Sequence, residues 1–197
     1  MNTLIIYAHP NRKGNNGLIL NEVISELKEK KEPYELLDLY HQKFDAMLTE
    51  KELYTQGNRH IAKSTLKYQE MISKAQKLII IYPVWWNNMP AILKGFFEKV
   101  ITPRFAFKYE LYFGKLPVPI GLLKGKRASV FITTNSPKFI YWLVQKARAS
   151  STIKRDILGF CSIKSRVFHY DNAIKYNKDD KRTSNLVRKG LKWLYKK

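Results

Sequence analysis

Short strand-like segments, of which the first and third are apolar runs, alternate along the chain with longer segments in which apolar residues recur every three or four positions. Such runs are typical of strands buried on both faces of a parallel sheet. The strand-like segments are Thr3–Ala8, Tyr34–Leu39, Lys77–Tyr82, Arg127–Thr134 and Ser165–Tyr170. The helical spacing predicts helices at about 16–31, 60–75, 90–101, 139–158 and 179–194.

Strands that alternate with helices predict parallel pairing through βαβ crossovers. Five strands in a chain of this length favour an α/β fold with a doubly wound sheet in the order 2-1-3-4-5 and helices on both faces. No internal repeat, low-complexity tract or Gly/Ser linker divides the sequence, so we expect one domain over residues 1–197. In the second helix we expect Ile61, Leu66 and Ile72 to face inward.

Composition places the chain among globular proteins, with 45% apolar residues. A single cysteine, Cys161, excludes a disulfide within the chain and favours a reducing compartment, the cytoplasm. We expect Cys161 to be a small buried residue. The sequence shows no signal peptide, and no apolar run approaches the ~20 residues that span a bilayer.

Positive charge is concentrated in the second half of the chain. Residues 1–100 contain 14 Lys and Arg against 11 Asp and Glu, and residues 101–197 contain 22 against 5, so the second half carries +17 of the net +20. Such a half could meet nucleic acid, an anionic membrane surface or a phosphorylated small molecule. The lysines are scattered through periodic segments, which favours the alternative of a solvated surface.

Ligands of doubly wound sheets bind outside the carboxyl ends of the strands. Three segments of unusual composition should meet there. They are the first loop, His9–Gly17 ("HPNRKGNNG"), the second loop, Pro83–Met89 ("PVWWNNM"), and the third loop, Thr133–Pro137 ("TTNSP").

The first loop has the composition of an anion-binding turn. Gly14 and Gly17 let the backbone turn tightly, and Asn15 or Asn16 can cap the following helix. Free N–H groups at a helix N-terminus attract phosphate. Further donors would come from His9, Arg12 and Lys13. The known Gly-rich phosphate motifs are absent, and an ordinary turn is the alternative.

The second loop places two adjacent tryptophans, Trp85 and Trp86, between Pro83 and Pro90. Pro83 ends the strand ladder, and Pro90 begins the next helix. The aromatics therefore lie on a short, stiff loop, where an indole can lie against a planar heterocycle. The alternative is that the tryptophans pack on a partner subunit or beneath a neighbouring loop.

The third loop offers hydroxyls, an amide and exposed N–H groups, which suit the polar rim of a heterocycle, although a plain turn is the alternative. Other chemistries find little support. Four scattered histidines and one cysteine form no metal-ligand cluster, so no metal site is predicted. No G-x-S-x-G motif is present, and His169, which closes a strand, is interpreted as structural.

Four stretches together resemble the flavodoxin-like NAD(P)H:quinone oxidoreductases. They are "LIIYAHPN", "YPVWWNNMPAILKGFFEKV", "FAFKY" and "LLKGKRASVFITT". The similarity covers roughly residues 1–170 in the right order, and the Trp-Trp segment is specific. The resemblance implies a non-covalently held flavin, a homodimer with the site at the subunit interface, and two-electron, ping-pong reduction of quinones by NAD(P)H. The long segment 40–75 favours FAD, with FMN as the alternative.

The resemblance also implies roles for individual residues. The phosphate side of the flavin corresponds to His9, Gly14, Asn15 and Asn16. The isoalloxazine ring corresponds to Pro83, Val84, Trp85, Trp86 and Asn87. Its polar edge corresponds to Thr133, Thr134, Asn135, Ser136 and Tyr141. The aromatics that cover the partner's substrate correspond to Phe107 and Tyr109, which with Tyr141 are the predicted catalytic residues.

Four departures from the family pattern bear on activity. Gly14 replaces a hydroxyl residue, and Phe107 replaces a tyrosine. "TTNSP" replaces a Gly-rich turn, and Ala147 stands nearest to the place of a histidine that some members use to relay charge. Slower quinone turnover or a different acceptor is therefore expected.

A rival interpretation keeps the flavin and makes the chain a regulatory subunit of a membrane transporter. The basic second half and "FIYWLVQKAR" (Phe139–Arg148) would then face a membrane or a membrane protein. A nucleic-acid binder is least favoured, because the sequence contains no recognised nucleic-acid motif.

Overall fold

The computed structural model describes residues 3–53, 61–173 and 180–196. Within them, five strands form one parallel sheet in the order β2-β1-β3-β6-β7, which confirms the predicted fold class and strand order. The strands are β1 (Thr3–Tyr7), β2 (Tyr34–Asp38), β3 (Lys77–Pro83), β6 (Arg127–Thr133) and β7 (Lys164–Tyr170).

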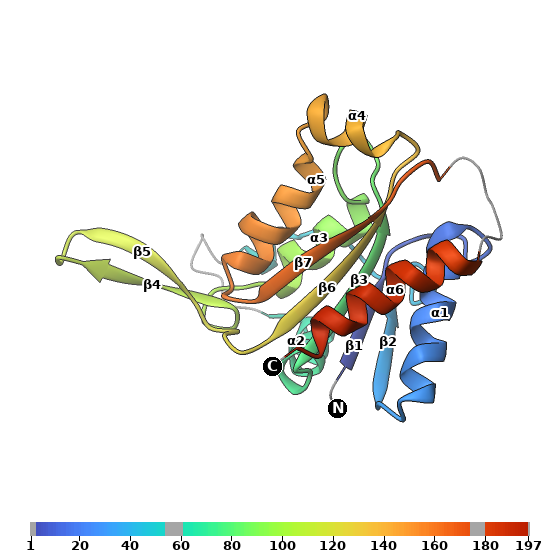
Figure 1. Cartoon of the computed structure of the whole chain (residues 1–197). Helices are drawn as coiled ribbons and strands as arrows, with labels where there is room; N and C mark the ends of the chain where they lie inside the picture. The colour runs from blue at the N-terminus through green and yellow to red at the C-terminus, as the bar shows by residue number, and fades with distance from the viewer. Residues whose placement is uncertain (1–2, 54–60, 174–179, 197) are drawn as a thin grey trace.

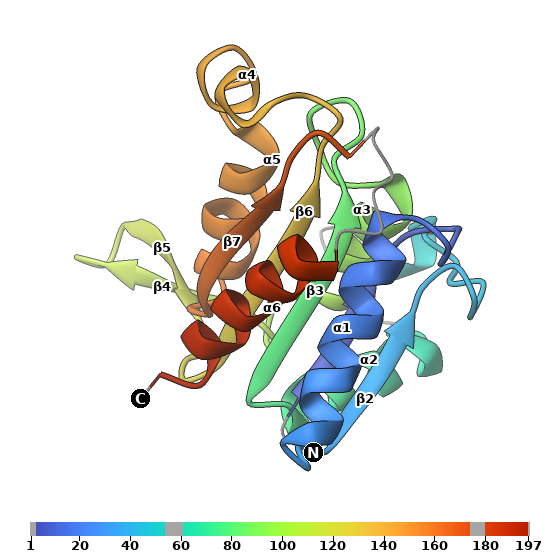
Figure 2. The same ribbon diagram turned by 45° about the vertical axis from the view of Figure 1, so that its right-hand side comes forward.

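Alternate residues of the central strands point to the two faces of the sheet, and each face carries its own core. Ile5 of β1 and Ile79 of β3 pack with α1 (Asn15–Glu29) and α6 (Asp180–Leu194). Leu4 and Ile80 pack on the opposite side with α2 (Lys63–Lys74), α3 (Ala91–Val100) and η3, a wide π-helix over Thr152–Gly159. Figures 1 and 2 show α1 and α6 together on one face, with α2, α3 and α5 (Arg148–Ser151) on the other.

Two helix predictions need correction. The helix predicted over 139–158 is divided into α4 (Lys138–Leu143), α5 and η3, because Lys146 and Ala147 adopt left-handed backbone angles. In the second helix, Ile72 is buried as predicted, but Ile61 and Leu66 are exposed. Ile61 precedes the first residue of α2, and the buried face of that helix falls on Thr65, Gln69, Met71 and Ile72.

A β-hairpin that the hydrophobic pattern did not predict stands apart from the sheet. Its strands are β4 (Phe107–Tyr112) and β5 (Leu116–Gly121), which pair antiparallel. Phe113 and Gly114 both have positive φ, and the Lys115 amide donates to the Tyr112 carbonyl at 3.2 Å, as in a type I′ turn. The hairpin is exposed except at Phe107, which is buried, and at Val118 and Gly121, which are half-buried, and it projects away from the body of the molecule (Figure 1).

The remaining described helix is η1, one short 3₁₀ turn over Glu50–Glu52. None of the helices in the described ranges is long and apolar enough to cross a membrane. Cys161 is buried as predicted.

Candidate functional site

The three loops at the carboxyl ends of β1, β3 and β6 are joined by direct contacts. The side-chain amide of Asn16 donates to the Thr133 hydroxyl at 2.9 Å, which ties the first loop to the third. The Val84 amide donates to the Thr133 carbonyl at 2.8 Å, which ties the second loop to the third. The rings of His9 and Trp85 lie 6.0 Å apart. The predicted meeting of the three loops at one edge is therefore present in the structure.

The first loop delivers a helix N-terminus to this edge. Helix α1 begins at Asn15, and Gly14 is its N-cap residue without a capping side chain. The prediction that Asn15 or Asn16 caps the helix is wrong, because both lie in its first turn and their amides donate elsewhere, Asn15 to the Ala173 carbonyl at 2.7 Å and Asn16 to Thr133. The first N–H groups of a helix have no intrahelical acceptor, so they are available to an anion.

Because Gly17 has no side chain, the first loop packs directly against the first turn of α1, and we call this arrangement the cradle. A Cβ atom built on Gly17 would lie 1.7 Å from the carbonyl oxygen of Arg12. The loop therefore folds back against the helix so closely that only glycine fits at this position. A Cβ on Gly14 would meet nothing within 4 Å, so only one of the two glycines is required by packing.

Two of the three basic side chains of the first loop already have partners. The Arg12 guanidinium donates to the Asp38 carboxylate at the end of β2, with Nε at 2.8 Å. Nδ1 of His9 lies 2.6 Å from the Asn11 carbonyl oxygen and 3.0 Å from the Asn11 amide nitrogen, so Nε2 is the ring nitrogen that remains for a ligand. Arg12 is thus committed to holding the loop, and it is not the free phosphate donor that the sequence suggested.

The second loop is a tight turn that projects an indole outward. Trp85 and Asn88 exchange two backbone hydrogen bonds of 2.9 Å, and Trp86 and Asn87 between them both have positive φ. This is a type I′ arrangement, which non-glycine residues adopt at a cost. Trp86 is fully exposed and Trp85 is 41% exposed, whereas the Asn87 amide donates to the Gln145 carbonyl at 3.0 Å.

The third loop is held by a network around Thr134. The Thr134 hydroxyl donates to the Ser136 carbonyl at 3.0 Å, so its oxygen accepts from Nε2–H of His169 at 2.7 Å. This network assigns the tautomer of His169 and leaves Nδ1 buried without a partner among the described residues. Burial lowers the pKa of His169 to about 4, so the ring is neutral at physiological pH. Asn135 is exposed at the tip of the loop.

Tyr141 supports the third loop from beneath. Its side chain is buried, and its ring lies 4.6 Å from that of His169. Its hydroxyl bonds to Oγ of Ser150 at 2.7 Å and accepts from the Ser150 amide at 3.0 Å. Burial raises the pKa of Tyr141. This geometry suits a positioning residue, since the hydroxyl is turned toward α5.

The two aromatics of the hairpin have different surroundings. Phe107 is buried in its own chain, with its ring 4.8 Å from that of Phe160. Tyr109 is 60% exposed on the projecting part of β4. Of this predicted pair, only Tyr109 is presented to a second molecule.

Sequence reasoning missed several residues that shape this edge. His169 was expected only as a strand residue, yet it fixes the Thr134 hydroxyl. Gln145 and Ala173 contribute through their carbonyl groups alone. A carbonyl carries no side-chain signal, so these contacts follow only from the path of the backbone. Ala147, nearest to the family's relay histidine, is buried and places no polar group here.

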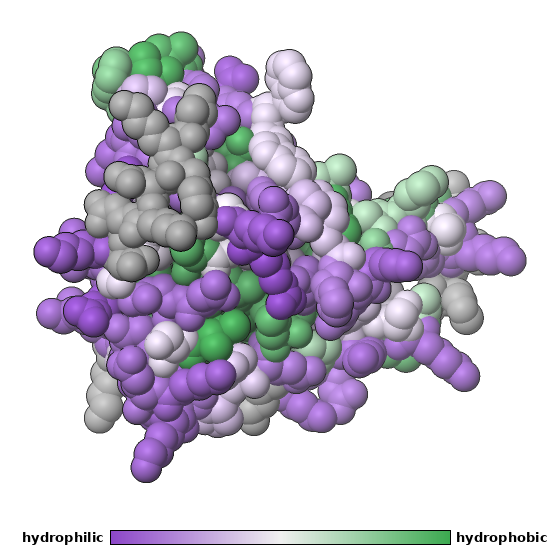
Figure 3. All heavy atoms as spheres, turned by 90° about the vertical axis from the view of Figure 1, so that its right-hand side faces the viewer, coloured by the Kyte–Doolittle hydropathy of each residue, from purple (hydrophilic) through white to green (hydrophobic). Residues whose placement is uncertain are grey.

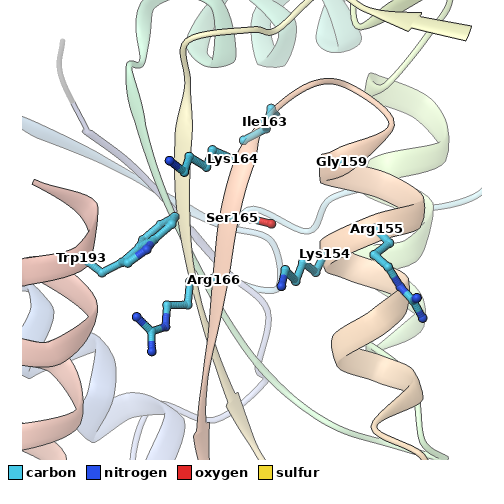
Figure 4. A pocket seen from close by; sticks show the side chains of 8 residues that line it. All are labelled: Lys154, Arg155, Gly159, Ile163, Lys164, Ser165, Arg166 and Trp193. Atoms are coloured by element: carbon cyan, nitrogen blue, oxygen red, sulfur yellow. The ribbon is translucent and has the colours of Figure 1, made fainter. Parts of the chain in front are cut away.

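Part of the basic half lies on β7, the edge strand of the sheet, and on the neighbouring η3. A hollow of about 620 Å³ there is lined mainly by basic side chains and Trp193. Figure 4 shows Lys154 extending from η3 toward β7, with Lys164 and Arg166 on the strand itself. Lysine on an edge strand discourages pairing with another chain. Edge protection accounts for this part of the charge without a ligand.

Comparison with known proteins gives a consistent result. The sequence model of a family described by its flavodoxin-like fold matches residues 1–194. A Haemophilus influenzae protein named as an uncharacterized NAD(P)H oxidoreductase is 32% identical over 171 residues, 85% of this chain and 82% of that protein. NAD(P)H dehydrogenase [quinone] 1 of Cavia porcellus is 30% identical over 157 residues, 71% of this chain but only 55% of that protein.

Solved structures with the same fold are also found. The protein Smu.1420 of Streptococcus mutans has a TM-score of 0.82 at 32% identity, with 98% of both chains covered. An FMN-dependent NADH-azoreductase of Bacillus anthracis, solved in complex with FMN, has a TM-score of 0.71 at 20% identity, again with 98% of both chains covered. At that identity the azoreductase shows a shared fold alone.

Proposed function

This chain belongs to the flavodoxin-like NAD(P)H:quinone oxidoreductase family and is an oxidoreductase, and on that premise we propose that it is a flavin-dependent enzyme that reduces quinones or similar acceptors with NAD(P)H. When bound, a flavin would supply the chemistry of hydride exchange between NAD(P)H and the acceptor. The chain's own residues bind and orient the flavin and exclude water from it.

The observation that carries the proposal is the cradle at the start of α1. Free N–H groups, the side-chain-free Gly17 and the available ring nitrogen of His9 suit the phosphate of a flavin nucleotide. The side-chain oxygens of Asn15 and Asn16 are buried and have no hydrogen-bond partner in the described part of the chain. The hydroxyls of a ribityl chain would complete such orphan acceptors. The start of α1 therefore suits a phosphate, and the side chains of Asn15 and Asn16 suit the sugar alcohol next to it.

The second and third loops suit the flat ring. The backbone of Pro83 and Val84 lies at the carboxyl edge of the sheet, at the end of β3. The exposed indoles of Trp85 and Trp86 offer apolar surface for an isoalloxazine. Oδ1 of Asn87 is another buried acceptor without a partner among the described residues, and it would accept from a ring N–H. Thr133, Thr134, Asn135 and Ser136 would contact the polar edge through hydroxyl, amide and backbone N–H groups.

A second copy of the chain would complete the site. The projecting hairpin exposes Leu111, Tyr112, Phe113 and Leu116 together with Tyr109. An apolar arm of this kind is expected to lie against another molecule. In a two-fold dimer each arm would cover the other subunit's site and bring Tyr109 over the acceptor. Phe107, buried in its own chain, would brace that arm.

We keep FAD as the first choice of flavin, with FMN as the alternative. We also propose a reducing compartment, the cytoplasm, as the place of action. Cys161 is buried and burial raises the pKa of its thiol to about 11, so it is poorly suited to redox exchange or to an intermolecular disulfide.

The test is an absorption spectrum of the purified protein from about 300 to 550 nm, where flavins absorb, before and after anaerobic addition of NADPH. Bound flavin that bleaches on addition, and then reoxidises when a quinone is added, would support the proposal. Extraction would then distinguish FAD from FMN. Absence of flavin after incubation with both nucleotides would contradict it.

Trp86→Ala tests the ring wall specifically. We expect flavin affinity to fall about fivefold, or the flavin spectrum to shift, because a stacking contact with an aromatic ring is worth about 1 kcal/mol. Trp142→Ala is the matched control, since Trp142 is also exposed but lies on α4. Equal flavin binding by the two variants would remove Trp86 from the site.

A further inference from the structure

Helix α4 and the turn after it form an apolar tip. Phe139, Trp142, Leu143 and Val144 are 62%, 53%, 76% and 70% exposed. We call these four residues the apolar tip. In Figure 1, α4 stands at the top of the molecule, and Figure 3 shows apolar side chains gathered at that height above a largely hydrophilic face. Four large apolar side chains exposed within six residues indicate a surface that contacts another molecule.

Basic side chains surround the apolar tip. Lys138, Lys146 and Arg148 flank it in sequence and are exposed. In the described ranges, none of the three makes an ion pair or hydrogen-bonds a carboxylate through its side chain. Lys138 and Trp142 also line a hollow of about 410 Å³ that continues to Lys189 and Lys192 of α6, and its described lining contains no acidic residue. The tip therefore combines apolar anchors with a positive collar.

Three kinds of partner can be compared for this combination. In a two-fold contact between copies, the patch would face itself, so Lys138, Lys146 and Arg148 would meet like charges. A nucleic acid would use the charges and Trp142, but it gives no apolar environment to Leu143 and Val144. An anionic lipid surface satisfies both parts, because its headgroups pair with the collar and its acyl region receives the tip.

We propose that the apolar tip of α4 docks this protein reversibly on anionic lipid surfaces. The depth of insertion is shallow, since the tip is one short helix of six residues with its following turn. The positive charge of the collar makes docking depend on anionic lipid and on ionic strength.

The apolar tip is joined to the candidate site. The Asn87 amide of the second loop donates to the carbonyl of Gln145, directly after Val144. Docking would therefore bring the mouth of the site close to the bilayer and favour an acceptor dissolved in lipid. This consequence rests on the proposed oxidoreductase function, whereas the docking itself does not.

The experiment is co-sedimentation of the full chain with vesicles of phosphatidylcholine alone or mixed with phosphatidylglycerol, at low and high salt. We expect binding to the anionic vesicles at low salt, little binding to phosphatidylcholine, and loss of binding at high salt. Leu143→Glu with Val144→Glu should weaken binding at least about tenfold, because two anchors become anions. Met47→Glu, at a residue 77% exposed outside the tip, is the matched control.

Each result has a defined meaning. Absence of binding to anionic vesicles, or equal binding by the tip variant and Met47→Glu, would overturn the proposal. A tip variant that changes oligomeric state in sedimentation would assign the tip to a second copy and would also overturn it. Flavin content and turnover with a water-soluble quinone, measured on the same preparations, test the proposed function separately. Intact turnover without vesicle binding refutes only the docking, and vesicle binding without flavin refutes only the enzyme.

Discussion

Acid should destabilise this protein through one buried imidazole. Burial lowers the pKa of His169 from 6.5 to about 4, and Lys138 and Arg182 add repulsion, opposed by Asp171. Between pH 6.5 and 4 the unfolded chain therefore binds a proton that the folded chain excludes. The free energy of unfolding should fall as the pH falls through this window and become independent of His169 below it.

The magnitude follows from the shift in pKa. A change from 6.5 to about 4 corresponds to about 3 kcal/mol for a fully shielded group, since one pKa unit is about 1.4 kcal/mol. The ring is only partly buried, so solvent screening reduces our expectation to about 1–2 kcal/mol. Hydrogen bonds to Lys30 and Arg188 lower the pKa of Glu26. The contribution of Glu26 to the free energy of unfolding is therefore lost only as the pH falls below the ordinary pKa of a carboxyl group.

The assay is urea unfolding, followed by circular dichroism, at a series of pH values from about 7 to about 3, a range that brackets both pKa values of His169. His169→Gln is the informative variant, because its amide nitrogen can still donate to Thr134 but does not titrate. The difference in unfolding free energy between wild type and variant cancels the carboxylates and isolates the histidine. Parallel pH profiles for the two proteins would refute the reasoning, as would an NMR titration that gives His169 a pKa of 6.5 or higher.

Three further changes test the cradle, the core and the hairpin. Gly17→Ala should displace the first loop, lower stability by about 1–3 kcal/mol and abolish tight flavin binding, as measured by thermal melts and absorbance titrations. Gly14→Ala, with open space around its Cβ, should leave flavin binding unchanged and cost at most about 1 kcal/mol, because alanine is a poorer N-cap than glycine. Gly190→Ala places a Cβ 2.3 Å from the Phe131 ring, so we expect a lower melting temperature with unchanged flavin affinity; an unchanged melt would show that α6 can shift at no cost. Leu111→Glu on the exposed hairpin should shift sedimentation toward the monomer and reduce quinone turnover, and a dimer of wild-type affinity would remove the hairpin from the interface.

The sheet was predictable because its three inner strands, β1, β3 and β6, are short and mostly apolar segments. Parallel strands buried on both faces leave a strong signal, and the alternation with helices then restricts the order of the strands. The hairpin left no such signal, since Lys108 and Glu110 interrupt its first strand and Pro117 and Pro119 its second. Apart from Phe107, whose ring packs against Phe160, these strands are largely exposed, so no buried apolar run marks them.

The candidate site was predictable in place but less so in its contacts. The rule that ligands bind at the carboxyl edge of the sheet located all three loops. Which side chains are free was not predictable, because Arg12 is taken by Asp38 from another strand and Tyr141 by Ser150 from another helix. Such pairings depend on residues far apart in the sequence, and composition does not reveal them. The same holds for His169, whose role comes from the parallel register of β6 and β7.

The second loop shows that stability alone does not explain this sequence. The left-handed backbone angle at Trp86 costs of order 1–3 kcal/mol, most of which glycine would remove, whereas asparagine, as at Asn87, tolerates such angles better. The turn keeps its geometry through the two hydrogen bonds between Trp85 and Asn88 and the bond from Asn87 to Gln145. The indole of Trp86 gains nothing from folding in exchange, because it remains fully exposed. A strained turn that presents an unburied tryptophan at the edge where the three loops meet is what the proposed contact between the indole and a flavin predicts.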